Sequence, residues 1–287
     1  MYTGKTQNLG IIGCPVEHSL SPAMQNAALS AAGLDYAYVA MSVAEEQLSE
    51  AVTGLKALKF RGFNVTIPHK AAIMPLLDVV DQNAAVMGAV NTVVVQDGSL
   101  HGYNTDVLGF MNALRDRGFD PQGKTAVLLG AGGAARAVLW GLLQGGVKLI
   151  RIGVRNVPKV EPLADFFRKY GQVELFHWEE DSFQHGLAEA DLLVNTTPLG
   201  MYPHIDAVPP VNWAYVQPKT FVYDIIYTPI QTKFLQMAEQ HGNPVLNGEG
   251  MLVGQGAEAF RLWTGQTADS LVMTQALRQA LQLSVGQ

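Results

Sequence analysis

The sequence predicts an α/β protein of two domains, and its length, its alternating segments and its glycine content each favour that fold class. The chain has 287 residues, of which 48% are hydrophobic, and a domain usually takes ~100–200 residues. Short β-like runs alternate with helix-like segments from end to end, which is typical of a parallel sheet covered by helices. The 29 glycines fit the many loop–helix junctions of such a fold.

The first part of the chain predicts an α/β unit that contains one hairpin. Strands are expected over 9–13, 36–43 and 62–67, and helices over 23–32, 45–58 and 70–77. Ser21 is expected to cap the first helix, with Pro22 at its first position. Asp97 and Gly98 lie between β-like runs at 93–95 and 100–103, which predicts a tight hairpin turn.

The second part predicts a series of βα units. A helix is expected over 107–117, followed by a strand over 125–129, a helix over 134–143 and a strand over 149–154. Further strands are expected over 173–176, 191–195 and 220–225, and two helices over 252–263 and 270–283. We therefore expect one domain of residues 1–106 plus 250–287 and a second of residues 107–249.

Composition excludes several classes of protein. The net charge is -6 with no block of like charge, which argues against nucleic acid binding. No window of about 20 residues is continuously apolar and no secretory leader is visible, so we expect no membrane span and a cytoplasmic location. The single cysteine, Cys14, fits a reducing compartment and is expected to be a small buried hydrophobe. No Cys or His spacing suggests a metal site.

A glycine-rich turn follows the strand over 125–129 and predicts a dinucleotide site. Gly130 allows the tight turn, and Gly132 lets the backbone approach a pyrophosphate that the amides of the next helix then hold. Such turns also occur as plain packing, but strand, helix and second strand all follow on schedule. The second strand ends in Arg155, with Lys159 close behind and no acid until Glu161. An acid at this place would bind the ribose of NAD, whereas basic side chains suit the 2′-phosphate of NADP. We therefore expect NADP and interpret Arg155 as a phosphate ligand, with a solvated arginine as the alternative.

Polar residues also follow the predicted strands of the first part. They lie in the segments 63–70, 88–92 and 102–106, and the carboxyl ends of strands are where open α/β sheets bind ligands. Reduction of a ketone by hydride needs a proton donor at the carbonyl oxygen, and Lys70 beside Asp106 could supply one. Spacing alone does not show that these two meet, and a lone lysine after a strand is more often solvated.

Six segments together resemble the shikimate dehydrogenase family. They are 15–22 (PVEHSLSP), 64–70 (NVTIPHK), 88–92 (GAVNT), 104–106 (NTD), 195–201 (NTTPLGM) and 251–257 (MLVGQGA). They occur in the family's order and span the chain from about Leu9 to Gly265. The resemblance implies an N-terminal α/β substrate domain, a C-terminal Rossmann-like NADP-binding domain, and C-terminal helices that return to the first domain. It also implies an NADP-dependent oxidoreductase that reversibly reduces 3-dehydroshikimate to shikimate in chorismate and aromatic amino acid biosynthesis.

The resemblance also assigns roles to residues. Lys70 and Asp106 would be the catalytic pair. The substrate would be bound by Ser19, Ser21, Asn64, Thr66, Lys70, Asn91, Asp106, Tyr227 and Gln255. The cofactor would be bound by Gly130, Ala131, Gly132, Gly133, Ala134, Arg155, Asn156, Lys159, Ile225 and Gly248.

The chain departs from the family pattern in two places. Val154 and Asn156 stand where the family usually has Asn and Thr, which predicts weaker selectivity for NADP. Gln82 stands where many relatives have an acid, and no role is assigned to it. The nearest alternative is an NAD-preferring quinate/shikimate dehydrogenase, against which Arg155 and the absent acid speak, and a catalytically idle ligand-binding paralogue is a second. The partner is a small-molecule substrate, and a homodimer stays open because the family has both monomers and dimers.

Overall fold

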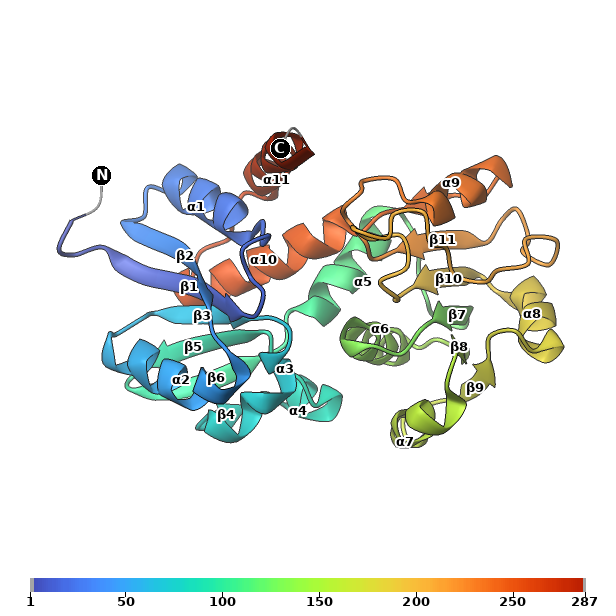
Figure 1. Cartoon of the computed structure of the whole chain (residues 1–287), viewed down its shortest axis with the longest axis horizontal. Coiled ribbons are helices and arrows are strands. Elements are labelled where there is room, and N and C mark those ends of the chain that lie inside the picture. Colours follow the sequence, from blue (N-terminus) through green and yellow to red (C-terminus); the bar gives the residue numbers. More distant parts are fainter. Residues whose placement is uncertain (1–2, 286–287) are drawn as a thin grey trace. The chain divides into compact units, whose positions relative to one another are not determined.

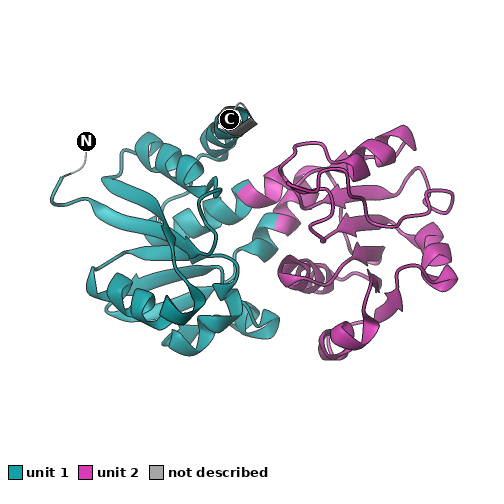
Figure 2. Ribbon diagram, viewed as in Figure 1, with its two compact units in different colours: residues 1–109, 253–287 teal, residues 110–252 magenta. Residues whose placement is uncertain are grey.

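The computed structural model describes residues 3–285 (Figure 1). The chain divides into two compact units, unit 1 of Met1–Gly109 with Val253–Gln287 and unit 2 of Phe110–Leu252 (Figure 2). These limits fall three residues beyond the expected boundaries after residues 106 and 249, inside the helices α5 (Asp106–Asp116) and α10 (Glu249–Thr264). Each unit contains its own six-stranded sheet.

The sheet of unit 1 has the strand order β2-β1-β3-β5-β6-β4. Its strands are β1 (Gln7–Gly13), β2 (Tyr36–Ser42), β3 (Gly62–Val65), β4 (Val79–Val80), β5 (Thr92–Gln96) and β6 (Ser99–Tyr103). The expected hairpin joins β5 to β6, with Asp97 at φ 50° and Gly98 at φ 77°. Because β5 runs antiparallel to both β3 and β6, this sheet is mixed, whereas β1, β2 and β3 are parallel.

Helices of unit 1 pack on both sides of this sheet (Figure 1). They include α1 (Ser21–Ala31), α2 (Leu48–Ala57), α3 (His69–Ala72), α4 (Gln82–Met87) and α11 (Ser270–Val285), with 3-10 turns at Glu45–Gln47 and Met74–Leu76. The expected return of the C-terminal helices is confirmed, because α11 packs against α1. A buried core that includes Ile12, Leu55 and Phe63 fills the space between the sheet and α2.

The expected capping role of Ser21 is wrong. Leu20 occupies the N-cap position of α1 in a helical conformation, and no side chain caps the helix. The hydroxyl of Ser21 instead hydrogen-bonds with the phenol of Tyr38 in β2. A contact within the fold has replaced the local contact with the helix amides.

Unit 2 is a fully parallel sheet with the order β12-β11-β10-β7-β8-β9. Its strands are β7 (Thr125–Leu129), β8 (Leu149–Val154), β9 (Val173–His177), β10 (Leu192–Asn195), β11 (Phe221–Asp224) and β12 (Val245–Leu246), and its helices include α6 (Gly133–Gln144), α7 (Val157–Phe167), α8 (Asp181–Gly186) and α9 (Lys233–Gln240). The strand order reverses between β7 and β10, and such a switch point is where open α/β sheets bind ligands. The expected Rossmann-like fold is confirmed.

Among residues 3–285, no helix combines the length and the apolar character that crossing a membrane requires.

Candidate functional site

The polar residues of unit 1 meet because the ends of three strands lie at one edge of its sheet. β3 ends at Val65, just before Thr66 and Lys70. β5 runs in the opposite direction, so its first residue, Thr92, pairs with Asn64 of β3. Thr92 also pairs with Tyr103, the last residue of β6, and the segment 104–106 follows directly. The antiparallel hairpin therefore brings the segments 64–70, 91–92 and 104–106 together.

Lys70 and Asp106 form an ion pair at this edge. Lys70 Nζ donates to Asp106 Oδ2 over 2.6 Å. The side chains are 25% and 12% exposed, so the pair is shielded from bulk water yet open to a small molecule. Lys70 belongs to the short helix α3, and Asp106 is the first residue of α5.

Asn91 fixes the other oxygen of this carboxylate. Its Nδ2 donates to Asp106 Oδ1 over 2.8 Å and to Thr105 Oγ1 over 3.0 Å. Its Oδ1 accepts from the amide of Thr105 over 2.8 Å and from Thr92 Oγ1 over 3.0 Å. All three neighbours are buried. Because both carboxylate oxygens of Asp106 have partners, the orientation of the acid is set before any ligand binds.

Tyr38 extends this network and was missed by the sequence analysis. Its hydroxyl donates to Asn64 Oδ1 over 2.7 Å, and Asn64 Nδ2 donates to Thr92 Oγ1 over 3.0 Å. Burial raises the pKa of the Tyr38 phenol above its ordinary value, so the group is a neutral donor. The hydroxyl of Ser21 bonds to the same phenol. Tyr38 therefore links the α1 segment to the segment that carries Lys70.

The remaining predicted substrate residues of unit 1 differ in exposure. Ser19 is half-buried and its Oγ accepts from the amide of Ser21 over 3.3 Å. Thr66 is half-buried, and Gln255 is buried on α10. Next to Gln255, the carbonyl of Gly256 accepts from Gln25 Nε2 over 2.9 Å, which ties α10 to α1.

Three residues near this edge, Cys14, His69 and His18, are not assigned a catalytic role. Cys14 is exposed, so the expectation of a buried cysteine is wrong. It lies in the loop after β1, where the chain has left the core. His69 is buried, and its Nε2 lies 2.7 Å from the carbonyl oxygen of Val43, which is a structural contact. His18 is exposed.

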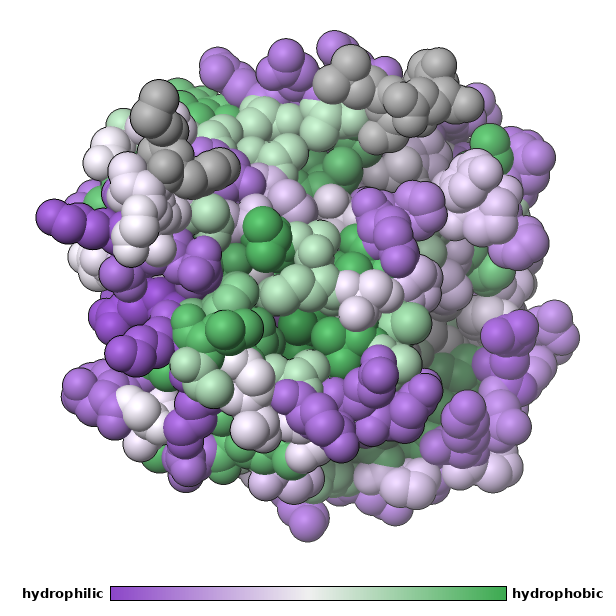
Figure 3. Space-filling view, turned by 60° about the vertical axis from the view of Figure 1, so that its left-hand side comes forward, coloured by the Kyte–Doolittle hydropathy of each residue, from purple (hydrophilic) through white to green (hydrophobic). Residues whose placement is uncertain are grey.

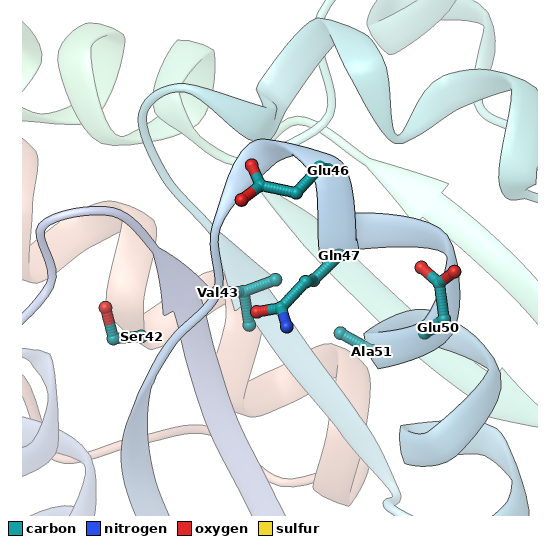
Figure 4. Close-up of a pocket in the computed structure, with 6 residues that line it drawn as sticks. All are labelled: Ser42, Val43, Glu46, Gln47, Glu50 and Ala51. Carbon is teal, nitrogen blue, oxygen red and sulfur yellow. The ribbon is translucent and has the colours of Figure 1, made fainter.

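A separate hollow of about 520 Å³ lies beside α2 (Figure 4). It is lined by Ser42, Val43, Glu46, Gln47, Glu50 and Ala51. The carboxylates of Glu46 and Glu50 give it negative charge, and a carboxylate ligand would be repelled there. It therefore does not compete with the hydroxyl-lined edge as a site for an acidic substrate.

The glycine turn of unit 2 fits a nucleotide phosphate. Gly130 has φ 96°, and a Cβ there would lie 2.6 Å from Thr197 Cγ2, so only glycine fits. Gly132 and Gly133 are exposed, with open space where a side chain would stand. No side chain caps α6 and no acid lies in its first turn. The start of α6, around Ala134, therefore has amides without a side-chain cap beside two uncrowded glycines, an arrangement suited to an anion. Ala131 is half-buried within the turn.

Basic groups follow β8, where a nucleotide ribose would lie in this fold. Arg155 is exposed, and its Cζ lies 5.9 Å from the ring centroid of Trp178, a cation–π contact that holds the guanidinium. Asn156 caps α7, because its Oδ1 accepts from the amide of Lys159 over 3.0 Å. Its side-chain NH2 and the exposed ammonium of Lys159 stay available for a phosphate. Trp178 was not predicted, because it is far from Arg155 in sequence.

The last predicted cofactor residues lie in two segments, Ile225 directly after β11 and Gly248 between β12 and α10. The amide of Gly248 donates to the carbonyl of Ile226 over 2.9 Å, and a Cβ on Gly248 would collide with the carbonyl oxygen of Ile225. Tyr227 is half-buried, and burial raises the pKa of its phenol, so it too is a neutral donor.

A Rossmann-like unit with an open phosphate turn and an α/β unit with a shielded Lys–Asp pair define an α/β oxidoreductase that uses a dinucleotide. The profile of the shikimate dehydrogenase substrate binding domain matches residues 11–93. The profile of the shikimate 5'-dehydrogenase C-terminal domain matches residues 248–278. The chain belongs to the shikimate dehydrogenase family.

Full-length relatives support this membership. The chain is 46% identical to a shikimate dehydrogenase (NADP(+)) of Moorella thermoacetica, over 97% of this chain and 95% of the relative. It is also 46% identical to a shikimate dehydrogenase (NADP(+)) of Methanopyrus kandleri, over 96% of this chain and 97% of the relative.

Solved structures of the family share the fold. Shikimate 5-dehydrogenase of Listeria monocytogenes, in complex with shikimate and NAD, has a TM-score of 0.92 at 36% identity, covering 96% of this chain and 97% of that one. The Thermus thermophilus enzyme, in complex with NADP(H) and shikimate, has a TM-score of 0.86 at 37% identity, covering 96% and 100%. Quinate dehydrogenase of Corynebacterium glutamicum, in complex with NAD, has a TM-score of 0.88 at 31% identity, covering 96% and 99%.

Proposed function

We propose that this chain catalyses the reversible reduction of 3-dehydroshikimate to shikimate with NADPH, a step of chorismate and aromatic amino acid biosynthesis. The observation that carries the proposal is the ion pair of Lys70 and Asp106, fixed by Asn91 and set among neutral hydroxyl and amide groups. Full-length relatives named as NADP-dependent shikimate dehydrogenases agree with it.

Neutral polar side chains suit the substrate, a cyclic carboxylic acid with several hydroxyl groups. In the proposal, Ser19 and Ser21 bind the carboxylate through hydroxyl groups. The ring hydroxyl groups are bound by Thr66, Asn91, Asp106 and Gln255, with Asn64 behind them and the neutral phenol of Tyr227 as a further donor. Because each ring hydroxyl has a hydrogen-bond partner in the protein, the site rejects analogues that lack one hydroxyl, whose buried partner would then be left unsatisfied.

Lys70 is the proposed acid and base. Bound NADPH supplies the hydride that the carbonyl carbon of the substrate accepts. Lys70 Nζ gives a proton to the carbonyl oxygen as that oxygen gains charge, and it takes the proton back in the reverse direction. Asp106 keeps the ammonium group in place through the bond of 2.6 Å. The neutral amine that is left then takes up a proton from solvent and becomes an ammonium group again.

The cofactor is proposed to bind to unit 2. The turn at Gly130, Ala131, Gly132, Gly133 and Ala134 binds the pyrophosphate, since Gly132 and Gly133 leave open space there and no side chain caps the helix that follows. Arg155, Asn156 and Lys159 bind the 2′-phosphate by charge-assisted contacts. Ile225 and Gly248 flank the nicotinamide.

The nearest competing function is that of an NAD-preferring quinate/shikimate dehydrogenase. The chain is similar to a quinate dehydrogenase solved with NAD, but Arg155 stands where an acid would bind the NAD ribose. Initial rates with shikimate and quinate, each with NADP+ and NAD+, separate the two functions. We expect the highest kcat/KM for shikimate with NADP+. A preference for quinate or for NAD+ refutes the proposal, and no turnover at all identifies an idle paralogue.

We also propose a cytoplasmic location and assembly as a homodimer. NADPH is an intracellular reductant, and a single cysteine suits a reducing compartment. Hydrophobic surface gathers on one face of the molecule inside a hydrophilic border (Figure 3), and such a surface favours association. Sedimentation measures the mass, for which a homodimer gives twice 31.0 kDa; a single species of 31.0 kDa at micromolar concentration refutes the dimer.

A further inference from the structure

Asp224 is a buried acid to which neither the proton transfer nor phosphate binding gives a role. It is the last residue of β11, and its side chain is 0% exposed. Burying a carboxylate is costly unless hydrogen bonds compensate. The bonds that Asp224 accepts therefore indicate what it does.

The carboxylate joins three segments of unit 2. Its Oδ1 accepts from Asn195 Nδ2 and from the amide of Ile226, each over 3.1 Å. Its Oδ2 accepts from Thr232 Oγ1 over 2.6 Å. Asn195 ends β10, Ile226 lies in the loop after β11, and Thr232 caps α9.

The Asn195 side of this network leads to the phosphate turn. Asn195 Oδ1 accepts from the amide of Thr197 over 3.0 Å, which shapes the loop after β10. In that loop Thr196 Oγ1 lies 2.9 Å from the carbonyl oxygen of Leu129 and 3.1 Å from that of Gly130. The methyl group of Thr197 closes the space above Gly130. The loop after β10 therefore fixes the turn at Gly130.

The Ile226 side leads to the loop proposed to flank the nicotinamide. The amide of Ile225 donates to the carbonyl of Asn195 over 3.2 Å. The carbonyl of Ile226 accepts from Gly248 over 2.9 Å. Asp224 thus connects the loop after β10, which fixes the phosphate turn, with the loop after β11, which is proposed to flank the nicotinamide.

We infer that Asp224 is a positioning residue for the dinucleotide, because its carboxylate holds the loop after β10 and the loop after β11 in one arrangement. This inference rests on the proposed function, in which both loops serve the cofactor. Asp224 acts through Asn195, Ile226 and Thr232, and it touches neither substrate nor cofactor.

Four variants test the inference, with the Kd of NADP+ measured by calorimetry and kcat and the KM values measured in parallel. Asp224→Leu removes every bond to the acid, and Thr232→Val removes the bond to Oδ2 together with the cap that this hydroxyl gives to the amide of Leu235 in α9. Asp224→Asn keeps an oxygen for Asn195 and Ile226 and places an amide beside the Thr232 hydroxyl. Thr220→Val is the matched control, because Thr220 is equally buried at the other end of β11 and its hydroxyl donates to the carbonyl of Ala190 over 2.7 Å.

We expect the Kd and KM of NADP+ to rise at least about tenfold in Asp224→Leu and about threefold in Thr232→Val. Asp224→Asn should stay within about twofold of wild type. Thr220→Val should leave the Kd of NADP+ unchanged. The Kd of shikimate, most of whose proposed partners belong to unit 1, should change less than the Kd of NADP+ in each of the other three variants. If Asp224→Leu does not fold, the comparison of Thr232→Val with Thr220→Val decides.

Three results overturn the inference. Thr232→Val could bind NADP+ as tightly as wild type, or Thr220→Val could weaken binding equally, which would mean a general loss of structure. Asp224→Asn could bind as weakly as Asp224→Leu, which would mean that charge governs binding and position does not. A wild-type protein that binds NADP+ but oxidises neither shikimate nor quinate refutes the proposed function alone, because the binding comparison still stands.

Discussion

Lys70 Nζ lies 2.6 Å from Asp106 Oδ2, although 36 positions separate the two residues in the chain. The antiparallel hairpin of β5 and β6 makes this approach possible, since it returns the chain to the edge where β3 ends. The opposite oxygen of Asp106 is held by Asn91 over 2.8 Å. The acid therefore positions the lysine and is itself positioned.

Replacing Asp106 with Asn should lower kcat about 10²-fold or more, since the ammonium of Lys70 loses its charged partner. The KM of shikimate should rise less, because the amide still offers one oxygen. Steady-state kinetics in both directions measures both constants. The matched control is Asp78→Asn, which breaks the exposed pair of Lys56 and Asp78 (3.5 Å) and should change neither. An Asp106→Asn enzyme with wild-type kcat contradicts the assigned pair.

Replacing Tyr38 with Phe should raise the KM of shikimate about three- to tenfold and leave kcat within about twofold, because the lost hydroxyl orients Ser21 and Asn64 and touches no reacting atom. Tyr36→Phe on the same strand is the control and should behave as wild type. Equal effects of the two substitutions on the KM of shikimate, or a loss confined to kcat, would contradict the role of Tyr38 in orienting the substrate-binding residues.

Replacing Arg155 with Gln should raise the KM of NADPH about tenfold or more and leave the KM of NADH nearly unchanged, because only NADPH has the 2′-phosphate. Trp178→Leu should have a smaller effect of the same kind, since it removes the ring that holds the guanidinium. NADH is the internal control in each assay. If both cofactors lose affinity equally, Arg155 does not read the 2′-phosphate.

Asp224 makes the stability of the chain depend on pH. Burial raises the pKa of Asp224 from 3.8 to about 6, although hydrogen bonds from Thr232, Ile226 and Asn195 lower it. The folded state therefore binds this proton more tightly than the unfolded state, so the contribution is fully present below pH 3.8 and is lost as the pH rises through 6.

The free energy of unfolding of wild type minus that of Asp224→Asn should consequently fall by about 1.4 kcal/mol between pH 5 and pH 7.5. Urea denaturation of both proteins at the two pH values measures this difference, and the Asn variant cancels the contribution of all other titrating groups. A difference that stays constant or grows with pH would contradict the raised pKa.

The elements that the sequence predicted are those with local signals. The turn at Asp97 and Gly98 needs two residues with positive φ, and both have it. The short helix α4 was missed although its signal is present: Asp81 caps it through the amides of Asn83 and Ala84, and Gly88 ends it with φ 62°. Six residues show too little periodicity to be seen without those caps.

Candidate site residues could be predicted where they lie in a sequence motif. Residues whose contribution depends on a contact with a residue distant in the sequence could not be predicted. Lys70 and Asp106 lie in motif segments. Tyr38 and Trp178 read as ordinary strand and core aromatics, and only the tertiary contacts with Asn64 and Arg155 show what they do. Cys14 was misjudged because cysteine is usually buried, whereas this one lies in a surface loop.

The measurement that tests the account most directly is the turnover of Lys70→Met together with its affinity for shikimate. We predict that kcat falls about 10³-fold or more, while the Kd of shikimate, measured by calorimetry, rises less than about tenfold. Lys56→Met is the control and should keep full activity. A Lys70→Met enzyme that binds shikimate and retains near-normal turnover would contradict the assignment of Lys70 as the group that moves the proton.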